Sequence, residues 1–330
     1  MGKYAVLGAG SWGTALAMVL ANKGHAVTLT GRNADALAAM EQTRENTKYL
    51  PGILLPDSLA LTADVAEALS GAEMVVYAVP AQTFGQTLAK TKDLLAPGAL
   101  VVNVAKGIEQ GTLRTLSQVA EDVAPGVPYA VLSGPSHAEE VGRGLPTTVA
   151  VAAADAGLAQ RCQEAFFTDR FRVYTNDDLL GVEVGGALKN IMAVAAGISD
   201  GLGFGDNAKA ALMTRGVAEI ARLGLAMGAK EQTFAGLTGI GDLIVTCTSM
   251  HSRNRRCGIL IGQGHTPKEA RDEVGMVVEG LTTCEAANAL SQKKGVEMPI
   301  TEHLYRCLHG EITAAEAIHL LMSRSPKKEQ

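Results

Sequence analysis

The stretch Gly8-Ala9-Gly10-Ser11-Trp12-Gly13 decides how the amino-terminal half of this chain folds. An apolar run at residues 4–7 precedes it, an apolar segment with helical periodicity follows at 14–23, and a second apolar run occupies residues 25–30. A glycine loop between a strand and a helix, followed by another strand, is typical of a dinucleotide-binding unit. The glycine spacing alone would indicate little, and an incidental glycine-rich turn is the alternative.

Each glycine of this loop has an expected role. We expect Gly8 to permit a tight turn, Gly10 to let a pyrophosphate approach the backbone, and Gly13 to let the helix pack against the strand. The unpaired amides at the start of that helix would then face the phosphates.

Apolar runs alternate with helical stretches as far as about residue 174, which is typical of a mostly parallel sheet with helices on both faces. Strands are expected at residues 4–7, 25–30, 73–79, 100–105, 129–132, 147–152 and 171–174. Helices are expected at residues 14–23, 34–44, 83–95, 113–124 and 156–167. The sequence therefore predicts an α/β, Rossmann-type, doubly wound domain.

Strand patterns end after Asn176, and the rest of the chain shows long segments with helical periodicity. These segments lie at residues 181–199, 208–227, 282–293 and 313–323. We predict a dinucleotide-binding domain at residues 1–178 and an all-α substrate and catalytic domain at 179–330.

The composition restricts the partners and the compartment. The net charge of -5 in 330 residues argues against a nucleic-acid partner. The five cysteines are scattered and show no metal-binding spacing, so we expect no metal site. We expect a cytoplasmic protein with reduced thiols. Lys3 and the apolar residues 4–21 imitate a secretory signal, but the loop glycines would interrupt its helix. No other apolar run is long enough to predict an integral membrane segment.

The end of the second predicted strand indicates the cofactor. An adenosine 2′-hydroxyl is usually bound there by Asp or Glu, but this chain has Thr30-Gly31-Arg32-Asn33. Arg32 is suited to a 2′-phosphate or to stacking on adenine, which favours NADP(H) and leaves NAD(H) possible. The alternatives are a solvated Arg32 and a weaker ribose contact from Asp35.

Lys189 is the candidate proton donor. Helical spacing places it in line with Gly185 and Gly186, and the two missing side chains are expected to leave room for a planar ligand beside the ammonium. The alternative is a solvated lysine on a closely packed helix. Asp242 follows a glycine-rich turn and is expected to orient Lys189 or to accept a hydrogen bond from a substrate hydroxyl, with a helix N-cap as the alternative.

A basic segment at residues 248–256 is the candidate phosphate site. It places three arginines, hydroxyl groups and an amide ahead of a predicted helix, which suits a phosphate dianion, although a solvated basic helix face is the alternative. His251 is a weaker acid–base candidate than Lys189 because no carboxylate partner is evident. Lys106, Gly134 and Ser136 follow two strands and are expected at the ligand-binding edge of the sheet.

These motifs together resemble the bacterial-type NAD(P)-dependent glycerol-3-phosphate dehydrogenases. The matching stretches are residues 8–13, 106–109, 134–136 with 138–140, 186–190, 200–212, 239–248, 251–256 and 278–280. The resemblance implies reversible reduction of dihydroxyacetone phosphate to sn-glycerol 3-phosphate for glycerophospholipid biosynthesis, and it implies a homodimer. It departs at His137, where the family usually has an aromatic residue such as Phe.

Carried onto this sequence, the resemblance implies that Lys189 is the catalytic acid–base residue. It implies substrate contacts from Lys106, Gly134, Ser136, Lys189, Asp242, Ser252, Arg253 and Asn254. It implies cofactor contacts from Ser11, Trp12, Arg32, Tyr49, Lys106, Ala138, Arg253, Val277 and Glu279. A related β-hydroxy-acid dehydrogenase and a non-catalytic NADP(H)-binding sensor remain the alternatives.

Overall fold

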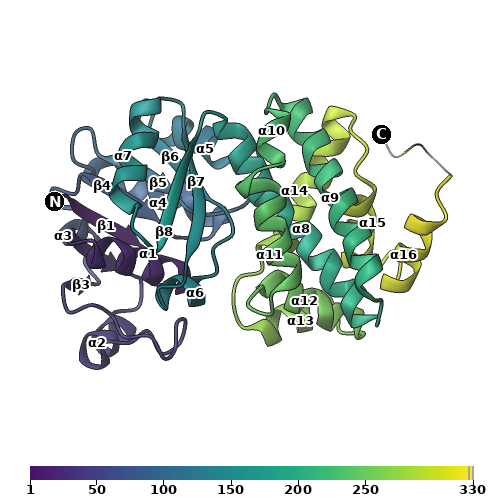
Figure 1. The fold of residues 1–330 in the computed structure, drawn as a ribbon, viewed down its shortest axis with the longest axis horizontal. Coiled ribbons are helices and arrows are strands. Elements are labelled where there is room, and N and C mark those ends of the chain that lie inside the picture. Colours follow the sequence, from purple (N-terminus) through teal and green to yellow (C-terminus); the bar gives the residue numbers. More distant parts are fainter. Residues whose placement is uncertain (326–327, 329–330) are drawn as a thin grey trace.

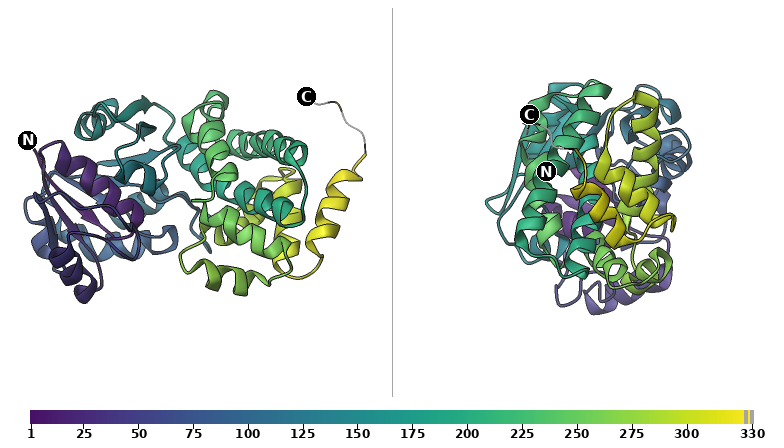
Figure 2. Two further views of the ribbon diagram at one scale, coloured as in Figure 1. Left: turned by 60° about the horizontal axis from the view of Figure 1, so that its bottom comes forward. Right: turned by 90° about the vertical axis from the view of Figure 1, so that its right-hand side faces the viewer.

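The computed structural model describes residues 1–325 and 328, so the last residues of the predicted second domain (326–327 and 329–330) lie outside the described part. An α/β lobe and a helical lobe lie side by side (Figures 1 and 2). Eight strands of the described residues form one sheet in the order β3-β2-β1-β4-β5-β6-β7-β8. Their bounds are β1 (Lys3–Leu7), β2 (Ala26–Thr30), β3 (Leu59–Thr62), β4 (Met74–Tyr77), β5 (Leu100–Asn103), β6 (Tyr129–Ser133), β7 (Thr147–Ala153) and β8 (Phe171–Asn176).

The sheet is mostly parallel, which confirms the predicted fold class. Strands β3, β2, β1, β4, β5 and β6 run parallel, β7 pairs antiparallel with β6, and β8 is parallel to β7. Leu7 at the end of β1 pairs with Thr30 on one side and with Tyr77 on the other. The strand order reverses at β1, and ligands of open α/β sheets bind at such a switch point, beyond the carboxyl ends of the strands.

Helices cover both faces of the sheet, so successive strand residues enter different cores. Val6 belongs to the core on the side of helices α1 (Ser11–Asn22) and α7 (Ala156–Phe166), whereas Ala5 belongs to the core on the side of α4 (Ala81–Thr91) and α5 (Leu116–Val123). The helices of this lobe are α1 (Ser11–Asn22), α2 (Ala34–Thr43), α3 (Val65–Leu69), α4 (Ala81–Thr91) with the 3-10 turn η1 (Lys92–Leu94), α5 (Leu116–Val123), α6 (Ala138–Gly142) and α7 (Ala156–Phe166).

Three short elements of this lobe were not predicted. The strand β3 has four residues at the edge of the sheet and only its first side chain is buried, so its alternation is too brief to show in the sequence. Helices α3 and α6 have five residues each, less than two turns. Helix α1 begins at Ser11 rather than near residue 14, because Gly10 is its N-cap.

The second lobe is built around the helix α8 (Leu179–Gly201), which Asp178 caps by accepting a hydrogen bond from the Gly181 amide. The other helices are α9 (Asp206–Met227), α10 (Glu231–Phe234), the π-helical turn η2 (Leu237–Gly241), α11 (Asp242–Thr248), α12 (Arg253–Gly262), α13 (Pro267–Val274), α14 (Glu279–Lys294), α15 (Pro299–Leu308) and α16 (Ala314–Met322). By length and composition α8 alone among the described helices passes as a membrane span, but 89% of its most apolar window is buried in the protein. It is a core helix.

Candidate active site

A cleft of about 1790 Å³ runs from the carboxyl ends of β1 and β2 to the helical lobe. Both lobes line it, including the glycine loop of the first and helices α8, α11 and α12 of the second. Of the residues predicted for the site, all except Gly134 line this cleft. These are Gly8, Gly10, Ser11, Trp12, Gly13, Arg32, Tyr49, Lys106, Ser136, Ala138, Lys189, Asp242, Ser252, Arg253, Asn254, Val277 and Glu279.

The glycine loop has the geometry that a pyrophosphate requires. Gly8 has φ +115°, and a Cβ there would lie 2.9 Å from the carbonyl carbon of Ala78. A Cβ at Gly13 would lie 2.9 Å from Ala78 Cβ, whereas one at Gly10 would have nothing within 4 Å. No side chain caps α1, so its first amides are available at an open surface of the cleft. This fits an anionic diphosphate at the helix N-terminus.

The end of the cleft beyond β2 is where the sequence predicts the adenosine. Arg32 is exposed there and lines the cleft, while Asn33 caps α2 by accepting a hydrogen bond from the Ala36 amide. Asp35 also lines the cleft, but it lies in the first turn of α2 and not at the end of the strand. Tyr49 is half-buried at the same end.

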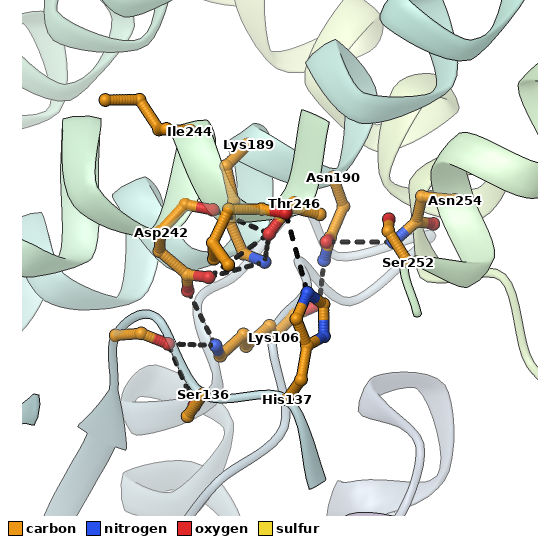
Figure 3. Close-up of polar contacts among 12 residues, drawn as sticks. Lys106, Ser136, His137, Lys189, Asn190, Asp242, Ile244, Thr246, Ser252 and Asn254 are labelled. Carbon is orange, nitrogen blue, oxygen red and sulfur yellow. Dashed lines mark hydrogen bonds and ion pairs between the residues drawn. The ribbon is translucent and has the colours of Figure 1, made fainter. Parts of the chain in front are cut away.

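Lys106, Asp242 and Lys189 form one buried charge cluster where the two lobes meet (Figure 3). Asp242 Oδ2 lies 2.6 Å from Lys106 Nζ, and its Oδ1 lies 2.9 Å from Lys189 Nζ. Lys106 follows β5, Lys189 lies in α8, and Asp242 begins α11. A single carboxylate therefore fixes the positions of two ammonium groups from different lobes.

Burial and charge oppose each other in this cluster. Burial lowers the pKa of Lys189 to about 8, against the opposing effect of the Asp242 carboxylate. Burial by itself would raise the pKa of Asp242, but Lys106 and Lys189 outweigh it and hold that pKa below its usual range. At neutral pH the carboxylate is ionised, and Lys189 holds a proton that it releases more readily than an exposed lysine would.

Both ammonium groups retain a donor for the cleft. Lys189 Nζ donates to Thr246 Oγ1 at 2.6 Å as well as to Asp242, and Lys106 Nζ donates to the Gly134 carbonyl at 3.0 Å as well as to Asp242. An ammonium has three N–H donors, so each keeps one beyond these partners. Gly134 thus acts through its carbonyl, which also accepts a hydrogen bond from Ser136 Oγ at 2.9 Å.

Asp242 is not an N-cap. It is the first residue of α11, whose N-cap is Gly241, and its side chain binds the two lysines. Thr246, one turn later on α11, donates to the Asp242 backbone carbonyl at 2.6 Å and so presents its oxygen to Lys189. Thr246 is not among the residues predicted from the sequence, although its spacing of four from Asp242 places it on the same helix face.

The explanation expected for the glycines beside Lys189 is wrong. A Cβ at Gly185 would lie 2.7 Å from the Thr238 carbonyl oxygen, and one at Gly186 would lie 2.7 Å from Ser133 Oγ. The space is filled by the turn η2 and the strand β6, not by a ligand. These glycines let α8 lie close to both η2 and β6.

The basic segment divides into two parts that face different ways. Helix α12 begins at Arg253, so the arginines lie within its first turn and not ahead of it. Ser252, Arg253 and Asn254 line the cleft, and Ser252 also caps α12 by accepting a hydrogen bond from the Arg255 amide at 3.2 Å. Arg255 is not among the cleft-lining residues and pairs with Asp200 at 2.7 Å, which corrects its expected role as a phosphate ligand.

A chain of amides joins the two ends of the site (Figure 3). Asn254 Nδ2 donates to Asn190 Oδ1 at 2.9 Å, and the Gly280 amide donates to Asn254 Oδ1 at 2.9 Å. Asn190 Nδ2 approaches the Lys106 carbonyl at 3.4 Å. Asn190 lies in the stretch 186–190, and only the fold reveals that it lies between residues of both lobes.

Glu279 connects the two lobes within the cleft. Its carboxylate accepts a hydrogen bond from the Ala81 amide, at the start of α4, at 2.9 Å. Burial raises its pKa, with the Ala81 amide and Arg253 opposing that effect. Val277, two residues earlier, is 46% exposed in the same cleft. Only the resemblance implies roles for these two residues, and the contact between Glu279 and Ala81 spans 198 positions, which no local pattern can indicate.

His137 and His251 meet across the cleft, with ring centroids 5.7 Å apart. Burial, and then the charge of Lys189, lower the pKa of His137. Its Nε2 lies 3.5 Å from the Val245 carbonyl oxygen. The residue at which the sequence departs from the family pattern therefore contacts the segment that leads to Ser252.

Among residues 1–325 and 328, no three His, Cys, Asp or Glu side chains gather as a metal site would require. The five cysteines at positions 162, 247, 257, 284 and 307 are all unpaired.

Known proteins resemble this chain in sequence and structure. The family description "NAD-dependent glycerol-3-phosphate dehydrogenase N-terminus" matches residues 3–159, and the corresponding C-terminus description matches residues 178–319. The chain is 52% identical to the glycerol-3-phosphate dehydrogenase (NAD(P)+) of Clostridium perfringens over the full length of both. It is 56% identical to that of Moorella thermoacetica over 97% of this chain and 95% of the relative.

A solved structure is similar as well. The crystal structure of glycerol-3-phosphate dehydrogenase from Coxiella burnetii superposes with a TM-score of 0.94 at 42% identity, covering 97% of this chain and 98% of the other.

Proposed function

Since this chain belongs to the NAD-dependent glycerol-3-phosphate dehydrogenase family, we propose that it catalyses the reversible reduction of dihydroxyacetone phosphate to sn-glycerol 3-phosphate with NAD(P)H. The observation that carries the proposal is the buried cluster in which Asp242 holds Lys106 and Lys189 at 2.6 and 2.9 Å within the cleft. It offers two directed ammonium donors beside a cofactor groove.

Lys189 is proposed as the general acid. The bound nicotinamide would supply or accept a hydride at C2 of the substrate, and the developing alkoxide needs a proton at the same time. Lys189 has a remaining N–H for that oxygen, and a pKa of about 8 makes its proton transferable near neutral pH. Asp242 and Thr246 fix its orientation, and Lys106 provides a second donor to the substrate.

The substrate phosphate is proposed to bind at the start of α12. Ser252, Arg253 and Asn254 line the cleft there, and a fork-like guanidinium with helix N-terminal amides suits a phosphate dianion. Ser136, which lines the cleft, is proposed to contact the carbon chain between this site and Lys106. Gly134 is proposed to act through Lys106 and Ser136, from which its carbonyl accepts hydrogen bonds. Binding at the phosphate end would hold the ketone in register with Lys189.

The cofactor preference is proposed from the adenosine end of the cleft. Gly8, Gly10, Ser11, Trp12 and Gly13 would hold the pyrophosphate, and Arg32 at the end of β2 favours NADP(H) while leaving NAD(H) usable. The remaining proposed cofactor contacts are Tyr49, Lys106, Ala138, Arg253, Val277 and Glu279.

The family context supports four further proposals. We propose that residues 1–178 form the dinucleotide-binding domain and residues 179–330 the substrate and catalytic domain. We propose that the protein is a cytoplasmic homodimer that supplies glycerol 3-phosphate to glycerophospholipid biosynthesis.

Paired assays test the reaction. Wild-type protein should oxidise NADPH, and NADH more slowly, on addition of dihydroxyacetone phosphate, and Lys189→Met should bind NADPH normally but lose most turnover. Lys230→Met is the matched control, because Lys230 is an exposed lysine whose ion-pair partner is Asp177. Turnover of a β-hydroxy acid in preference to the triose phosphate would favour the related dehydrogenase. NADPH binding without any turnover, or near-normal turnover by Lys189→Met, would contradict the proposed mechanism.

A further inference from the structure

A second charge cluster lies outside the cleft, behind the proposed phosphate site. The Asp200 carboxylate, at the end of α8, receives Arg255 Nε at 2.8 Å and a terminal guanidinium nitrogen at 2.7 Å. Lys209 of α9 lies 2.8 Å from its other oxygen. The side chains of Asp200 and Arg255 are only 14% and 12% exposed, so the pair is largely removed from solvent. This fork-like geometry on one carboxylate requires arginine rather than lysine.

The third donor group of Arg255 reaches the segment that precedes the phosphate site. Its Nη1 donates to the Thr248 carbonyl at 3.0 Å and lies 2.8 Å from the Met250 sulfur. The Arg255 amide donates to Ser252 Oγ at 3.2 Å. In the connection between α11 and α12, which extends from Thr248 to Ser252, the Arg255 side chain holds the start, at Thr248 and Met250. The backbone amide of Arg255 binds Ser252 at the other end.

Helix α8 gives this cluster a fixed relation to Lys189. Asp200 follows Lys189 by eleven residues, about three helical turns, so both lie on nearly the same face about 16 Å apart along the axis. The helices α8 and α12 also cross without side chains between them, since a Cβ at Gly197 would lie 2.9 Å from Gly258 Cα. A displacement of the connection relative to α8 is therefore resisted at the crossing and at the ion pair.

We propose that the Asp200–Arg255 ion pair is a positioning device that holds the connection at residues 248–252 and thereby sets the affinity of the site for the substrate phosphate. Arg255 does not touch the substrate in this arrangement. It acts through Ser252, Arg253 and Asn254, whose backbone follows the connection it holds. The inference rests on the proposed function, because it assumes that a phosphorylated substrate binds at the start of α12.

The test compares a substrate with and without the phosphate. Arg255→Lys retains the charge and one contact but cannot bind Asp200 with two nitrogens and the Thr248 carbonyl together. Asp200→Asn removes the charge that orients the guanidinium. The matched control is Arg306→Lys, in which a surface arginine that pairs with Glu311 at 3.4 Å is changed in the same way.

We expect kcat/KM for dihydroxyacetone phosphate to fall about tenfold or more in Arg255→Lys and Asp200→Asn. For unphosphorylated dihydroxyacetone we expect a change below about twofold, because Lys189 and its partners are untouched. Arg306→Lys should change neither value. Thermal unfolding measured in parallel identifies any variant that is simply misfolded, and Arg255→Lys, the milder change, decides the question in that case.

Equal losses for the two substrates would mean that the pair only stabilises the fold, and unchanged kcat/KM for dihydroxyacetone phosphate in Arg255→Lys would overturn the proposal outright. Wild-type protein without activity on dihydroxyacetone phosphate would contradict the proposed function, and the inference with it. Normal wild-type activity combined with equal losses for the two substrates, or with unchanged kcat/KM in Arg255→Lys, would contradict the inference but leave the proposed function standing.

Discussion

Replacing Asp242 by Asn tests whether one carboxylate controls the acidity of Lys189. The carboxylate lies 2.9 Å from Lys189 Nζ and 2.6 Å from Lys106 Nζ, and its side chain is 2% exposed. Asparagine keeps the shape but removes the charge, so two buried ammonium groups lose their common counter-ion. An opposite charge at this distance typically changes a pKa by about 1 to 3, and its loss disfavours the protonated form of a lysine.

The sign and size of the effect follow from the pKa of about 8 for Lys189. Lys189 must be protonated to act as an acid, so ketone reduction is lost as the pH rises through that pKa. In wild type about three quarters of the Lys189 side chains are protonated at pH ~7.5. If the pKa of Lys189 falls by about 1 to 3, the protonated fraction at this pH falls to between about a quarter and less than a hundredth. We expect reduction at this pH to fall from about threefold to more than a hundredfold in Asp242→Asn, with partial recovery toward pH ~5.5.

The assay is kcat/KM for dihydroxyacetone phosphate, followed by NADPH absorbance from pH ~5.5 to ~9.5, because this parameter reports groups of the free enzyme. The control is Asp177→Asn, which removes an exposed carboxylate whose ion pair with Lys230 lies outside the cleft. Its alkaline limb should coincide with that of wild type. An alkaline limb that stays near pH ~8 in Asp242→Asn, or moves upward, would refute the role given to Asp242.

Two further predictions concern cofactor choice and stability. Arg32→Asp should shift the ratio of kcat/KM values from NADPH toward NADH. A carboxylate at the end of β2 repels a 2′-phosphate and accepts hydrogen bonds from ribose hydroxyls. An unchanged ratio would exclude this role for Arg32. Burial raises the pKa of Glu219 from 4.5 to about 7 in the folded protein. The protonated carboxyl group therefore adds to the free energy of unfolding below pH ~4.5, and this stabilisation is lost as the pH rises toward 7. Glu219→Gln keeps an acceptor for the Ile300 amide but carries no charge. Its melting temperature should therefore be higher than that of wild type at pH ~8 and close to that of wild type at pH ~5. A difference in melting temperature that does not depend on pH would contradict this account.

Local patterns predicted the fold well. The glycine loop, the alternation of strands and helices, and the change to helical periodicity after Asn176 each depend on residues close in sequence. They led to the confirmed Rossmann-type sheet and to the helical region that follows. The edge strand β3 was not predicted, because it has four residues of which only one is buried, which is too short for a recognisable alternation of apolar and polar side chains.

The site was less predictable because its contacts join distant residues. Lys106 and Asp242 are 136 positions apart, and no local pattern indicates that one carboxylate serves both lysines. Local reasoning also misread side-chain direction. The space beside Gly185 was assigned to a ligand, but the turn η2 occupies it. Arg255 was assigned to the phosphate, but its side chain binds Asp200.

Helix α8 explains why these separate features belong to one mechanism. Near its start, Glu183 accepts hydrogen bonds from Ser117 and Tyr129 of the α/β lobe at 2.5 and 2.8 Å, which attaches the helix to the sheet that carries the glycine loop. Lys189 follows by six residues and Asp200 by a further eleven, so one helix relates the sheet edge, the proposed acid and the ion pair proposed to position the phosphate site. Hydride transfer requires the reacting atoms to be aligned closely, and a phosphate held far from the reacting carbon helps only if its anchor cannot move relative to the acid. The burial of α8 and its polar attachments at both ends satisfy that requirement before any ligand binds.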